Sequence, residues 1–330
     1  MNKILVMGSG SWGTALVKIL LEDSNVQVEW WVRSEESAAY INAKGRNQKY
    51  LRSVKFDMSR LRASSDAVSL VKANDIILLV TPSAFISDVM GPIDNSLLAG
   101  KKIISAIKGV EPQTLKIVGE YLFENKGVKE DDFGVITGPC HAEEVAQEKL
   151  SYLTFASTNE DFCAKMCISL DCSFIKVTPS ADIYGTEISA VLKNVYAIAA
   201  GMCHSLGYGD NFQAVLVSNA IREIKRFIAA VHPIDRDADD SAYLGDLLVT
   251  AYSQYSRNRT LGGMLGKGYS IKSALVEMEM VAEGYYATES IHKLNDKYTV
   301  DMPILNFVYG VIYEKKNIRE EAENLTKLLN

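Results

Sequence analysis

The sequence predicts an α/β protein in which a doubly wound parallel sheet domain is followed by a mostly α-helical domain. Three observations support this prediction. Short, almost continuous apolar runs alternate with helix-like segments in the first half of the chain, as a parallel sheet covered on both faces requires. A glycine-rich turn follows the first of these runs. From about Pro179 onward, strand-like runs fade and apolar residues recur at helical spacing instead.

The expected elements follow from the position of the apolar runs and the glycines and prolines that end them. A helix is expected over Trp12–Leu21, directly after the glycine turn. Strands are expected at Lys3–Met7, Val26–Val32, Asp75–Val80, Lys101–Ala106, Phe133–Thr137, Ser151–Ser157 and Ser173–Thr178. Later segments with helical spacing are Ser180–Cys203, Asn211–Val231 and Ser270–Asn295.

The length of 330 residues is enough for two domains, each with its own core. We expect a dinucleotide-binding domain over residues 1–179 and a helical substrate and catalytic domain over residues 180–330. No repeat or low-complexity linker separates them, so we expect close packing, with a ligand in the cleft between the domains.

Charge and hydropathy narrow the function classes. The chain carries 35 Lys and Arg against 41 Asp and Glu, a net charge of −6, which argues against a nucleic-acid partner. Small anionic substrates are not excluded, because a few placed cations can dominate a pocket. The apolar stretches are too short for an integral membrane segment, and glycines interrupt the start before a signal peptide is complete. We therefore predict a cytoplasmic protein.

The five cysteines do not have the spacing of paired metal ligands. Cys163, Cys167 and Cys172 are close in sequence, but no histidine lies near them. We predict no metal site and interpret these residues as buried thiols in a reducing compartment.

The segment from Gly8 to Gly13 reads G-S-G-S-W-G and fits the pattern G-x-G-x-x-G. The hexapeptide alone is a weak signal. Here it follows a predicted strand, opens a predicted helix and precedes a second strand, which is the setting of a Rossmann-type dinucleotide site. Gly8, Gly10 and Gly13 would allow the tight turn and the close approach of a pyrophosphate.

The end of the second strand bears on the choice of dinucleotide. An NAD site usually has Asp or Glu there to bind the ribose 2′-hydroxyl, whereas this chain has Arg33. A guanidinium suits a 2′-phosphate, so NADP is favoured over NAD. The alternative is that Arg33 is a solvated residue that stacks on adenine.

Two lysines are the strongest candidates for proton-transfer chemistry. Lys108 follows the Lys101–Ala106 strand, at the carboxyl edge of the sheet where ligands collect. Lys193 lies in an otherwise apolar helix, and desolvation there would lower its pKa toward neutrality. Among the four histidines only His141 has a suggestive place, just after a strand, where a simple helix-start role is equally consistent.

A third cluster lies between Gly245 and Gly268. Asp246 and Thr250 are four residues apart and would share a helix face. The arginines and asparagine of the segment 256–259 (Ser-Arg-Asn-Arg) offer several donors for a phosphate. The glycines that follow do not fit a nucleotide P-loop, because Leu261 replaces its first glycine and Gly268 its Ser or Thr.

Taken together, these motifs resemble the bacterial NAD(P)-dependent glycerol-3-phosphate dehydrogenase family. The resemblance runs from Gly8 to at least Glu283. Its marks, in order, are GSGSWGTAL, VTPS, KG at Lys108, GPCHAEEVA, LKNVYAIAAG, GDLLVT, SRNR and VAEG. It implies reduction of dihydroxyacetone phosphate to sn-glycerol 3-phosphate, which supplies glycerophospholipid synthesis.

The resemblance also implies roles for individual residues. Lys193 would be the general acid/base, Lys108 would touch both substrate and cofactor, and Asp246 would orient Lys193. The implied substrate-binding residues are Lys108, Gly138, Cys140, Lys193, Asp246, Thr250, Ser256, Arg257 and Asn258. The implied cofactor-binding residues are Gly8, Gly10, Ser11, Trp12, Gly13, Arg33, Lys108, Ala142, Arg257, Val281 and Glu283.

The chain departs from the family pattern at two places. Cys140 stands where relatives often have Ser or Thr, so that contact would use the backbone alone. Ser218-Asn219-Ala220 replaces a T-R-G triplet, whose arginine is lost here or replaced by a neighbour such as Arg222.

Two other functions stay open from the sequence. One is a β-hydroxyacid-type dehydrogenase that acts on a carboxylate, and the other is a non-catalytic NADP sensor. The oligomeric state, for which a homodimer is one option, is left open.

Overall fold

The computed structural model describes residues 2–278 and 282–330, and the chain separates into two compact units. The first comprises residues 1–107 and 118–183, and the second residues 108–117 and 184–330. The short segment Lys108–Ile117 therefore belongs to the helical unit, although the residues before and after it in sequence belong to the unit that contains the sheet. Val110 and Ile117 form an isolated antiparallel bridge and join the core of the second unit.

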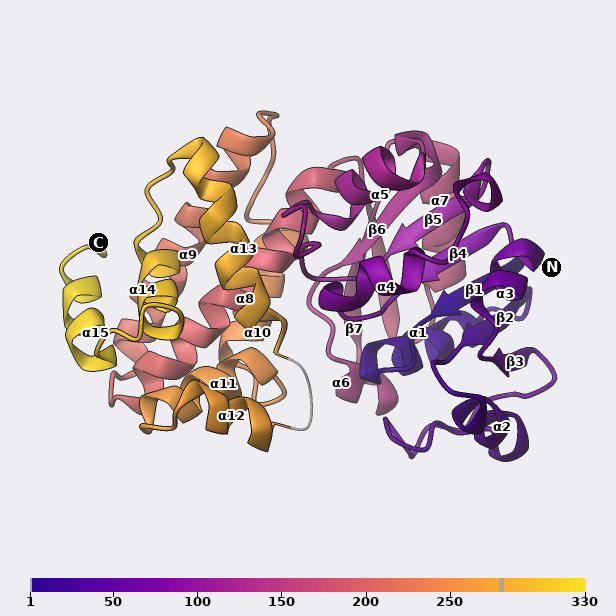
Figure 1. Ribbon diagram of the computed structural model, residues 1–330, viewed down its shortest axis with the longest axis horizontal. Coiled ribbons are helices and arrows are strands. Elements are labelled where there is room, and N and C mark those ends of the chain that lie inside the picture. The colour runs from indigo at the N-terminus through magenta and orange to yellow at the C-terminus, as the bar shows by residue number, and fades with distance from the viewer. Residues whose placement is uncertain (1, 279–281) are drawn as a thin grey trace. The chain divides into compact units, whose positions relative to one another are not determined.

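The first unit is built on an eight-stranded sheet of order β3-β2-β1-β4-β5-β6-β7-β8, with helices packed around it (Figure 1). The strands are β1 Asn2–Met7, β2 Val26–Trp31, β3 Leu61–Ser64, β4 Ile76–Leu79, β5 Lys102–Ser105, β6 Phe133–Thr137, β7 Ser151–Ala156 and β8 Ile175–Ser180. The helices are α1 Ser11–Glu22, α2 Glu35–Lys44, α3 Ala67–Ala73, α4 Ile86–Met90, α5 Val118–Lys126, α6 Ala142–Ala146 and α7 Glu160–Leu170, with 3₁₀ turns at Ser83–Phe85, Asn95–Leu98 and Glu130–Asp132.

Strand directions agree with the expected fold except at one edge of the sheet. Strands β1 to β6 are parallel, but β7 is antiparallel to β6, and β8 is parallel to β7. The expected doubly wound sheet is therefore confirmed as a mostly parallel one, with the antiparallel pairing at β7 as its exception. The β6–β7 connection contains only the five-residue helix α6, and an antiparallel neighbour needs no long crossover helix. Pro179, near which we expected the domain boundary, lies inside the edge strand β8, where proline is tolerated.

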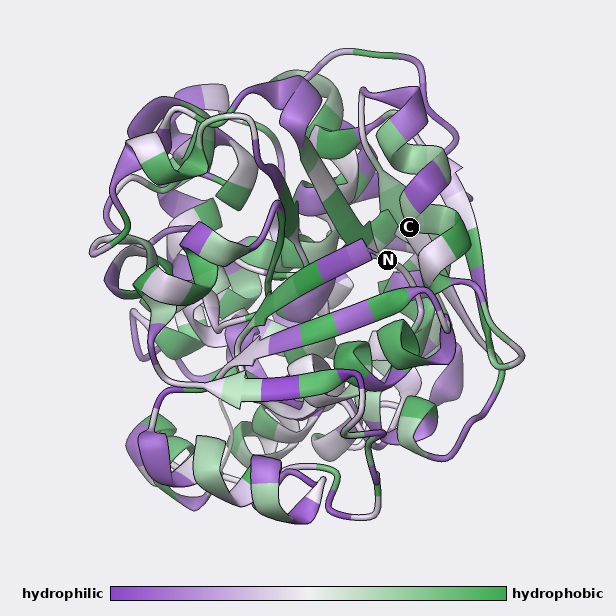
Figure 2. Ribbon diagram, turned by 90° about the vertical axis from the view of Figure 1, so that its right-hand side faces the viewer, coloured by the Kyte–Doolittle hydropathy of each residue, from purple (hydrophilic) through white to green (hydrophobic). Residues whose placement is uncertain are grey.

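The burial of each strand reflects its place in the sheet. Strand β6 is buried along its whole length, whereas β2 alternates between buried and half-buried residues. Figure 2 shows the contrast between β1, hydrophobic beyond its first two residues, and the mixed hydropathy of β2 beside it. Central strands covered on both faces thus give continuous apolar runs, which are the runs that the sequence revealed.

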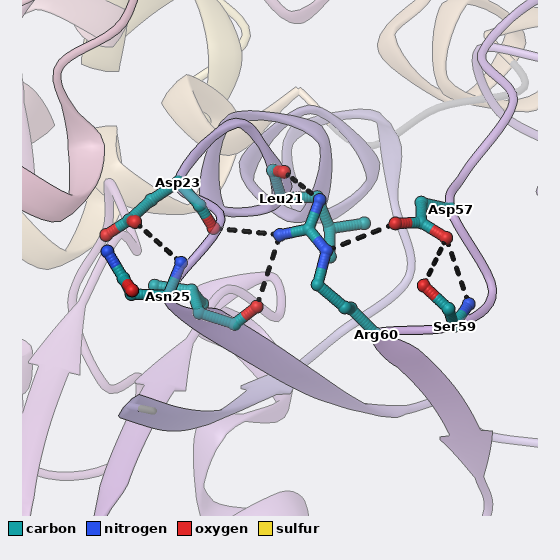
Figure 3. A network of polar contacts seen from close by, with 7 residues as sticks. Leu21, Asp23, Asn25, Asp57, Ser59 and Arg60 are labelled. Atoms are coloured by element: carbon teal, nitrogen blue, oxygen red, sulfur yellow. Dashed lines mark hydrogen bonds and ion pairs between the residues drawn. The ribbon is translucent and has the colours of Figure 1, made fainter.

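Strand β3 was not expected, because its four residues, L-R-A-S, form no apolar run. It is held in place by Arg60, which precedes it (Figure 3). The Arg60 guanidinium donates to the carbonyl oxygens of Leu21 at 2.7 Å and Asp23 at 2.8 Å, and it pairs with Asp57 at 3.1 Å. Helix α1 has no basic residue in its last turn, so Arg60 supplies donors to carbonyls that the helix leaves unpaired.

The second unit is helical and is organised around α8 Ile183–Ser205, in which every residue from 185 to 203 is buried. The other helices are α9 Asp210–Val231, α10 Asp246–Tyr252, α11 Arg257–Gly266, α12 Ile271–Glu277, α13 Glu283–Tyr298, α14 Pro303–Ile312 and α15 Ile318–Thr326, and a π-helical turn, Ser241–Gly245, leads into α10. The single helical segment expected over Ser270–Asn295 is two helices, because the backbone is extended at Met278 and Ala282. No helix of the described residues is long and apolar enough to cross a membrane.

A buried carboxylate on α9 caps the N-terminus of α14, which lies about 80 residues later in the sequence. Glu223 on α9 is fully buried and accepts hydrogen bonds from the N–H groups of Ile304 at 2.6 Å and Leu305 at 3.3 Å. Both groups lie in the first turn of α14, where backbone donors have no partner within the helix. Burial raises the pKa of Glu223 to about 7, while the two backbone hydrogen bonds, Tyr196 and Arg226 act in the opposite direction.

This raised pKa predicts a pH-dependent stability. The folded state binds the Glu223 proton more tightly than the unfolded state, in which the pKa of Glu223 is near 4.5. The contribution of this proton to the free energy of unfolding is therefore full below pH 4.5 and is lost as pH rises to about 7. The Glu223→Gln variant cannot titrate. We expect its free energy of unfolding, relative to wild type, to improve by about 3 kcal/mol across that window.

Urea unfolding of both proteins at several pH values measures this difference. Glu320→Gln on α15, an exposed carboxylate, is the control and should give a constant difference. A constant difference for Glu223→Gln as well would contradict the prediction.

Candidate active site

The glycine turn lies between β1 and α1 in the first unit and is shaped by close backbone contacts. A Cβ atom at Gly8 would lie 2.8 Å from the Val80 carbonyl oxygen, and one at Gly13 would lie 2.3 Å from the Gly8 carbonyl oxygen. Gly8 also has a φ of +133°. These two positions therefore require glycine for the fold itself.

Gly10 differs from them, because a Cβ atom there would meet nothing within 4 Å. Gly10 is the N-cap of α1, and no side chain caps that helix. A glycine that faces open space at a helix N-terminus suits the approach of a phosphate group. The turn thus fits the pyrophosphate of a dinucleotide.

Two buried side chains hold this turn by donating hydrogen bonds to its backbone carbonyls, and neither of them was identified from the sequence. The Trp30 indole N–H on β2 donates to the Gly8 carbonyl oxygen at 2.8 Å. The Asn47 amide donates to the Ser9 carbonyl oxygen and to the Thr14 hydroxyl, both at 2.9 Å. Asn47 lies in the connection between α2 and β3, where no motif marks it.

The other predicted cofactor and substrate residues of the first unit lie after neighbouring strands. Arg33 follows β2 and is exposed, and Ser34 beside it caps α2. Gly138 and Cys140 follow β6 and are buried. His141 is the N-cap of α6, whose first residue is Ala142. Because β1, β2 and β6 are parallel, all these positions lie at the carboxyl edge of the sheet.

The second unit brings the predicted lysines and aspartate together. Lys193 on α8 is 5% exposed, and Asp246, the first residue of α10, is 1% exposed. The Lys193 ammonium is hydrogen-bonded to Oδ1 of Asp246, and the Lys108 ammonium lies 3.6 Å from Oδ2. One buried carboxylate therefore serves two ammonium groups, although the three residues are far apart in sequence.

The surroundings of this cluster lower the pKa of Lys193 strongly. Burial lowers the pKa of Lys193 to about 7, opposed by the attraction of Asp246 and reinforced by the positive charge of Lys108. A lysine in this state can release and regain a proton near neutral pH. This was the expectation from its apolar sequence neighbours.

Asn194, the residue after Lys193, connects several parts of the site. Its Nδ2 donates to the Lys108 carbonyl oxygen at 3.1 Å, and its Oδ1 accepts from Asn258 at 2.9 Å. Asn258 Oδ1 in turn accepts from the Gly284 N–H at 2.8 Å. This chain of amides joins the Lys108 segment, α8, α11 and the start of α13. The sequence offered one signal for Asn194, its place next to Lys193.

The remaining predicted residues of the second unit have these positions. The Thr250 hydroxyl donates to the Asp246 carbonyl oxygen at 2.6 Å, so Thr250 supports the backbone of α10. Ser256 caps α11 by accepting from the Arg259 N–H, and Arg257, the first residue of α11, is half-buried. Glu283 begins α13. Val281 lies outside the described residues.

Lys108 is held in a short loop that depends on Glu111, which is 1% exposed. Glu111 Oε2 accepts from the N–H groups of Gln113 at 3.1 Å and Thr114 at 2.7 Å, and from the Thr114 hydroxyl at 2.7 Å. Hydrogen bonds to an ionised carboxylate are stronger than those to a neutral acceptor. Glu111 thus fixes the loop that carries Lys108, and nothing in the sequence pattern singled it out.

A glycine turn that fits a pyrophosphate and a buried lysine that can exchange a proton are together typical of a nicotinamide-dependent dehydrogenase. Comparisons with known proteins agree. Family models described as NAD-dependent glycerol-3-phosphate dehydrogenase N-terminus and C-terminus match residues 3–163 and 182–323. The chain belongs to the NAD-dependent glycerol-3-phosphate dehydrogenase family.

Similar proteins cover nearly the whole chain. Glycerol-3-phosphate dehydrogenase [NAD(P)+] of Staphylococcus haemolyticus is 36% identical and covers 98% of both chains. The protein of the same name from Oceanobacillus iheyensis is 35% identical, over 98% of this chain and 94% of its own. The crystal structure of glycerol-3-phosphate dehydrogenase from Coxiella burnetii has a TM-score of 0.90 at 29% identity, with 98% of both chains covered.

The Glu111 loop gives a prediction for the site. Glu111→Gln replaces the charged acceptor with a neutral one, so we expect a loss of about 1–3 kcal/mol in the free energy of unfolding. Faster amide exchange over residues 111–115, measured by hydrogen–deuterium exchange, should accompany it. Gln113→Ala is the matched control, because only the backbone N–H of Gln113 contacts Glu111. Unchanged exchange in Glu111→Gln would show that the loop does not depend on this carboxylate.

Proposed function

We propose that this protein catalyses the reversible reduction of dihydroxyacetone phosphate to sn-glycerol 3-phosphate with NAD(P)H, and so supplies glycerophospholipid synthesis. The observation that carries the proposal is the buried cluster of Lys193, Asp246 and Lys108, in a chain of the glycerol-3-phosphate dehydrogenase family. The cluster places a lysine with a pKa lowered to about 7 beside a fixed carboxylate.

The proposed cofactor-binding residues are those that the family resemblance implies. The turn from Gly8 to Gly13 would bind the pyrophosphate, and Ser11, Trp12, Arg33, Lys108, Ala142, Arg257, Val281 and Glu283 would complete the site. The chemistry that bound NAD(P)H supplies is a hydride for the ketone carbon. The residues of this chain would donate a proton to the ketone oxygen and stabilise the negative charge that develops on it.

Lys193 is the proposed general acid. In the reduction, its ammonium would give a proton to the ketone oxygen as the carbonyl carbon is reduced, which would leave an alcohol and neutral Lys193. Solvent then returns the proton to Lys193. Asp246 holds the ammonium in place through its hydrogen bond, and the second cation, Lys108, stabilises negative charge that develops on the oxygen.

The phosphate of the substrate would be bound at the start of α11. Arg257 is half-buried there and offers a planar set of donors. Asn258 already uses Oδ1 and one Nδ2 hydrogen bond within the protein, so a role for it would rest on its second amide hydrogen. Ser256 would assist Arg257, and Thr250 would support the network of Asp246. Gly138 and Cys140 are the other proposed substrate-binding residues.

Several features favour NADP over NAD. The two residues directly after β2, Val32 and Arg33, carry no carboxylate, and Arg33 is exposed. Ser37 and Lys49 line a small cavity of about 30 Å³ next to Ser9 of the glycine turn. A lysine and a hydroxyl near the glycine turn would suit a 2′-phosphate. A cytoplasmic location and the lack of a metal or nucleic-acid partner stay predictions from the sequence, and a homodimer stays one option for the oligomeric state.

The alternative of a β-hydroxyacid-type dehydrogenase is not favoured. D-mandelate dehydrogenase resembles the chain with a TM-score of 0.60 at 17% identity, a likeness of fold alone. The relatives at 35–36% identity are named for glycerol-3-phosphate. The non-catalytic alternative is disfavoured by the intact cluster around Asp246.

Initial rates with dihydroxyacetone phosphate test the proposed reaction. We expect NADPH and NADH both to be oxidised with this ketone, with a lower KM for NADPH because Arg33 can pair with the 2′-phosphate. Arg33→Ala should raise the KM for NADPH and leave that for NADH nearly unchanged. A 3-hydroxy acid is the comparison substrate. Turnover of the hydroxy acid without turnover of the ketone would refute the proposal.

The role of Lys193 has its own test. Lys193→Ala should lower kcat by about 10²–10⁴-fold while cofactor binding, followed by quenching of protein fluorescence, is preserved. In the wild type, reduction needs protonated Lys193, so its rate should fall as pH rises through about 7, and oxidation should rise over the same range. Lys225→Ala, an exposed lysine of α9, is the control. Full activity of Lys193→Ala would remove this residue from the mechanism.

A further inference from the structure

A second polar cavity lies in the helical unit, away from the lysine cluster. It has a volume of about 210 Å³ and is formed by one face of α8, one face of α11 and the connection between α10 and α11. It is lined by Gly201, His204, Ser205, Ser253, Gln254, Arg259, Thr260, Gly263, Met264 and Lys267. We call it the α8–α11 cavity. His204 follows Lys193 by 11 positions on α8, a rise of about 16 Å along the helix.

The charges that line the α8–α11 cavity have one sign. His204, Arg259 and Lys267 contribute basic groups, and no carboxylate lines it. Within the described residues, neither Arg259 nor Lys267 forms an ion pair, whereas Lys225 on α9 and Lys293 on α13 each have a carboxylate partner. In a chain of net charge −6, two unpaired cations in one cavity form a local positive site.

The cavity also offers neutral hydrogen-bond donors. The Ser205 hydroxyl and the Gln254 amide have no hydrogen-bonding partner among the described residues, so both can donate to a ligand. A Cβ atom at Gly263 would lie 3.3 Å from the Ser205 oxygen, so glycine there keeps the space in front of the hydroxyl open.

The carboxyl end of α11 does not cancel this positive character. The carboxyl end of α11 carries partial negative charge, but its carbonyls are already used. The Lys267 N–H donates to Gly263 at 3.2 Å, and the Tyr269 N–H donates to Met264 at 3.1 Å. Arg259 lies in the first turn of the same helix, where the dipole favours an anion.

We propose that the α8–α11 cavity binds a small anion that carries a phosphate group, at a site separate from the catalytic cluster. Arg259 and Lys267 supply the charge, His204 of α8 also lines the cavity, and Ser205 and Gln254 donate to the remaining oxygens. The volume suits inorganic phosphate or a short phosphomonoester, and it is below the size that pockets for larger ligands require.

Equilibrium dialysis of the full chain against inorganic phosphate tests this proposal. The Arg257→Ala background removes the proposed substrate-phosphate contact, so that the remaining binding reports on the α8–α11 cavity. We expect saturable binding in that background. Adding Lys267→Glu should weaken it by about tenfold or more, because an attractive charge is replaced by a repulsive one.

The matched control is Lys165→Glu, which makes the same change in net charge at an exposed position of α7 in the first unit. It should leave phosphate binding unchanged. Lys267 and His204 are both exposed, so Lys267→Glu is expected to fold, and His204→Ala gives a second variant that should also weaken binding. Circular dichroism and thermal unfolding check that each variant is native.

Glycerol 2-phosphate, a short phosphomonoester, is the second probe. Tighter binding than inorganic phosphate would assign the rest of the cavity to a carbon chain, and equal binding would assign the site to the phosphate group alone. The proposal is overturned if neither probe binds the Arg257→Ala protein, or if Lys267→Glu and Lys165→Glu bind phosphate equally well.

Discussion

The buried carboxylate of Asp246 is the constraint on which the catalytic half of this protein depends. A charge that is 1% exposed needs compensation, and Lys193 and Lys108 provide it from two other segments of the chain. This arrangement explains why residues 108–117 pack with the helical unit rather than with the sheet from which they emerge. Buried polar groups nearby support this arrangement. Glu111 fixes the loop that carries Lys108, and Asn194 of α8 donates to the Lys108 carbonyl oxygen.

The same contacts place a chemically useful lysine in an environment that shifts its pKa. Desolvation alone would leave Lys193 neutral and poorly oriented, and the carboxylate alone would hold it permanently charged. The balance of the two, modified by Lys108, gives a group that can exchange a proton near neutral pH. In the first unit, the glycine turn is held by neutral hydrogen bonds instead of charges, because Trp30 and Asn47 donate to its backbone carbonyls.

Much of this could be predicted from sequence, and the failures have physical causes. Seven of the strands were expected because buried parallel strands are apolar along their length, while β3 was missed because its four residues are mixed and its position depends on Arg60. Lys193, Lys108 and Asp246 were expected from apolar neighbours and from motifs. Glu111, Asn47 and Trp30 were not, because a residue that supports a backbone carbonyl or amide leaves no local pattern.

The sequence by itself determined the fold class, the glycine turn and the residues that carry the charge, because these depend on local patterning and residue chemistry. Only the tertiary structure decided which charges meet, that β7 runs antiparallel, and that the Lys108 segment belongs with the helices. It alone revealed the α8–α11 cavity, whose basic groups come from separate helices. Spacing along one chain encodes periodicity, whereas contacts between distant segments arise only when the cores have packed.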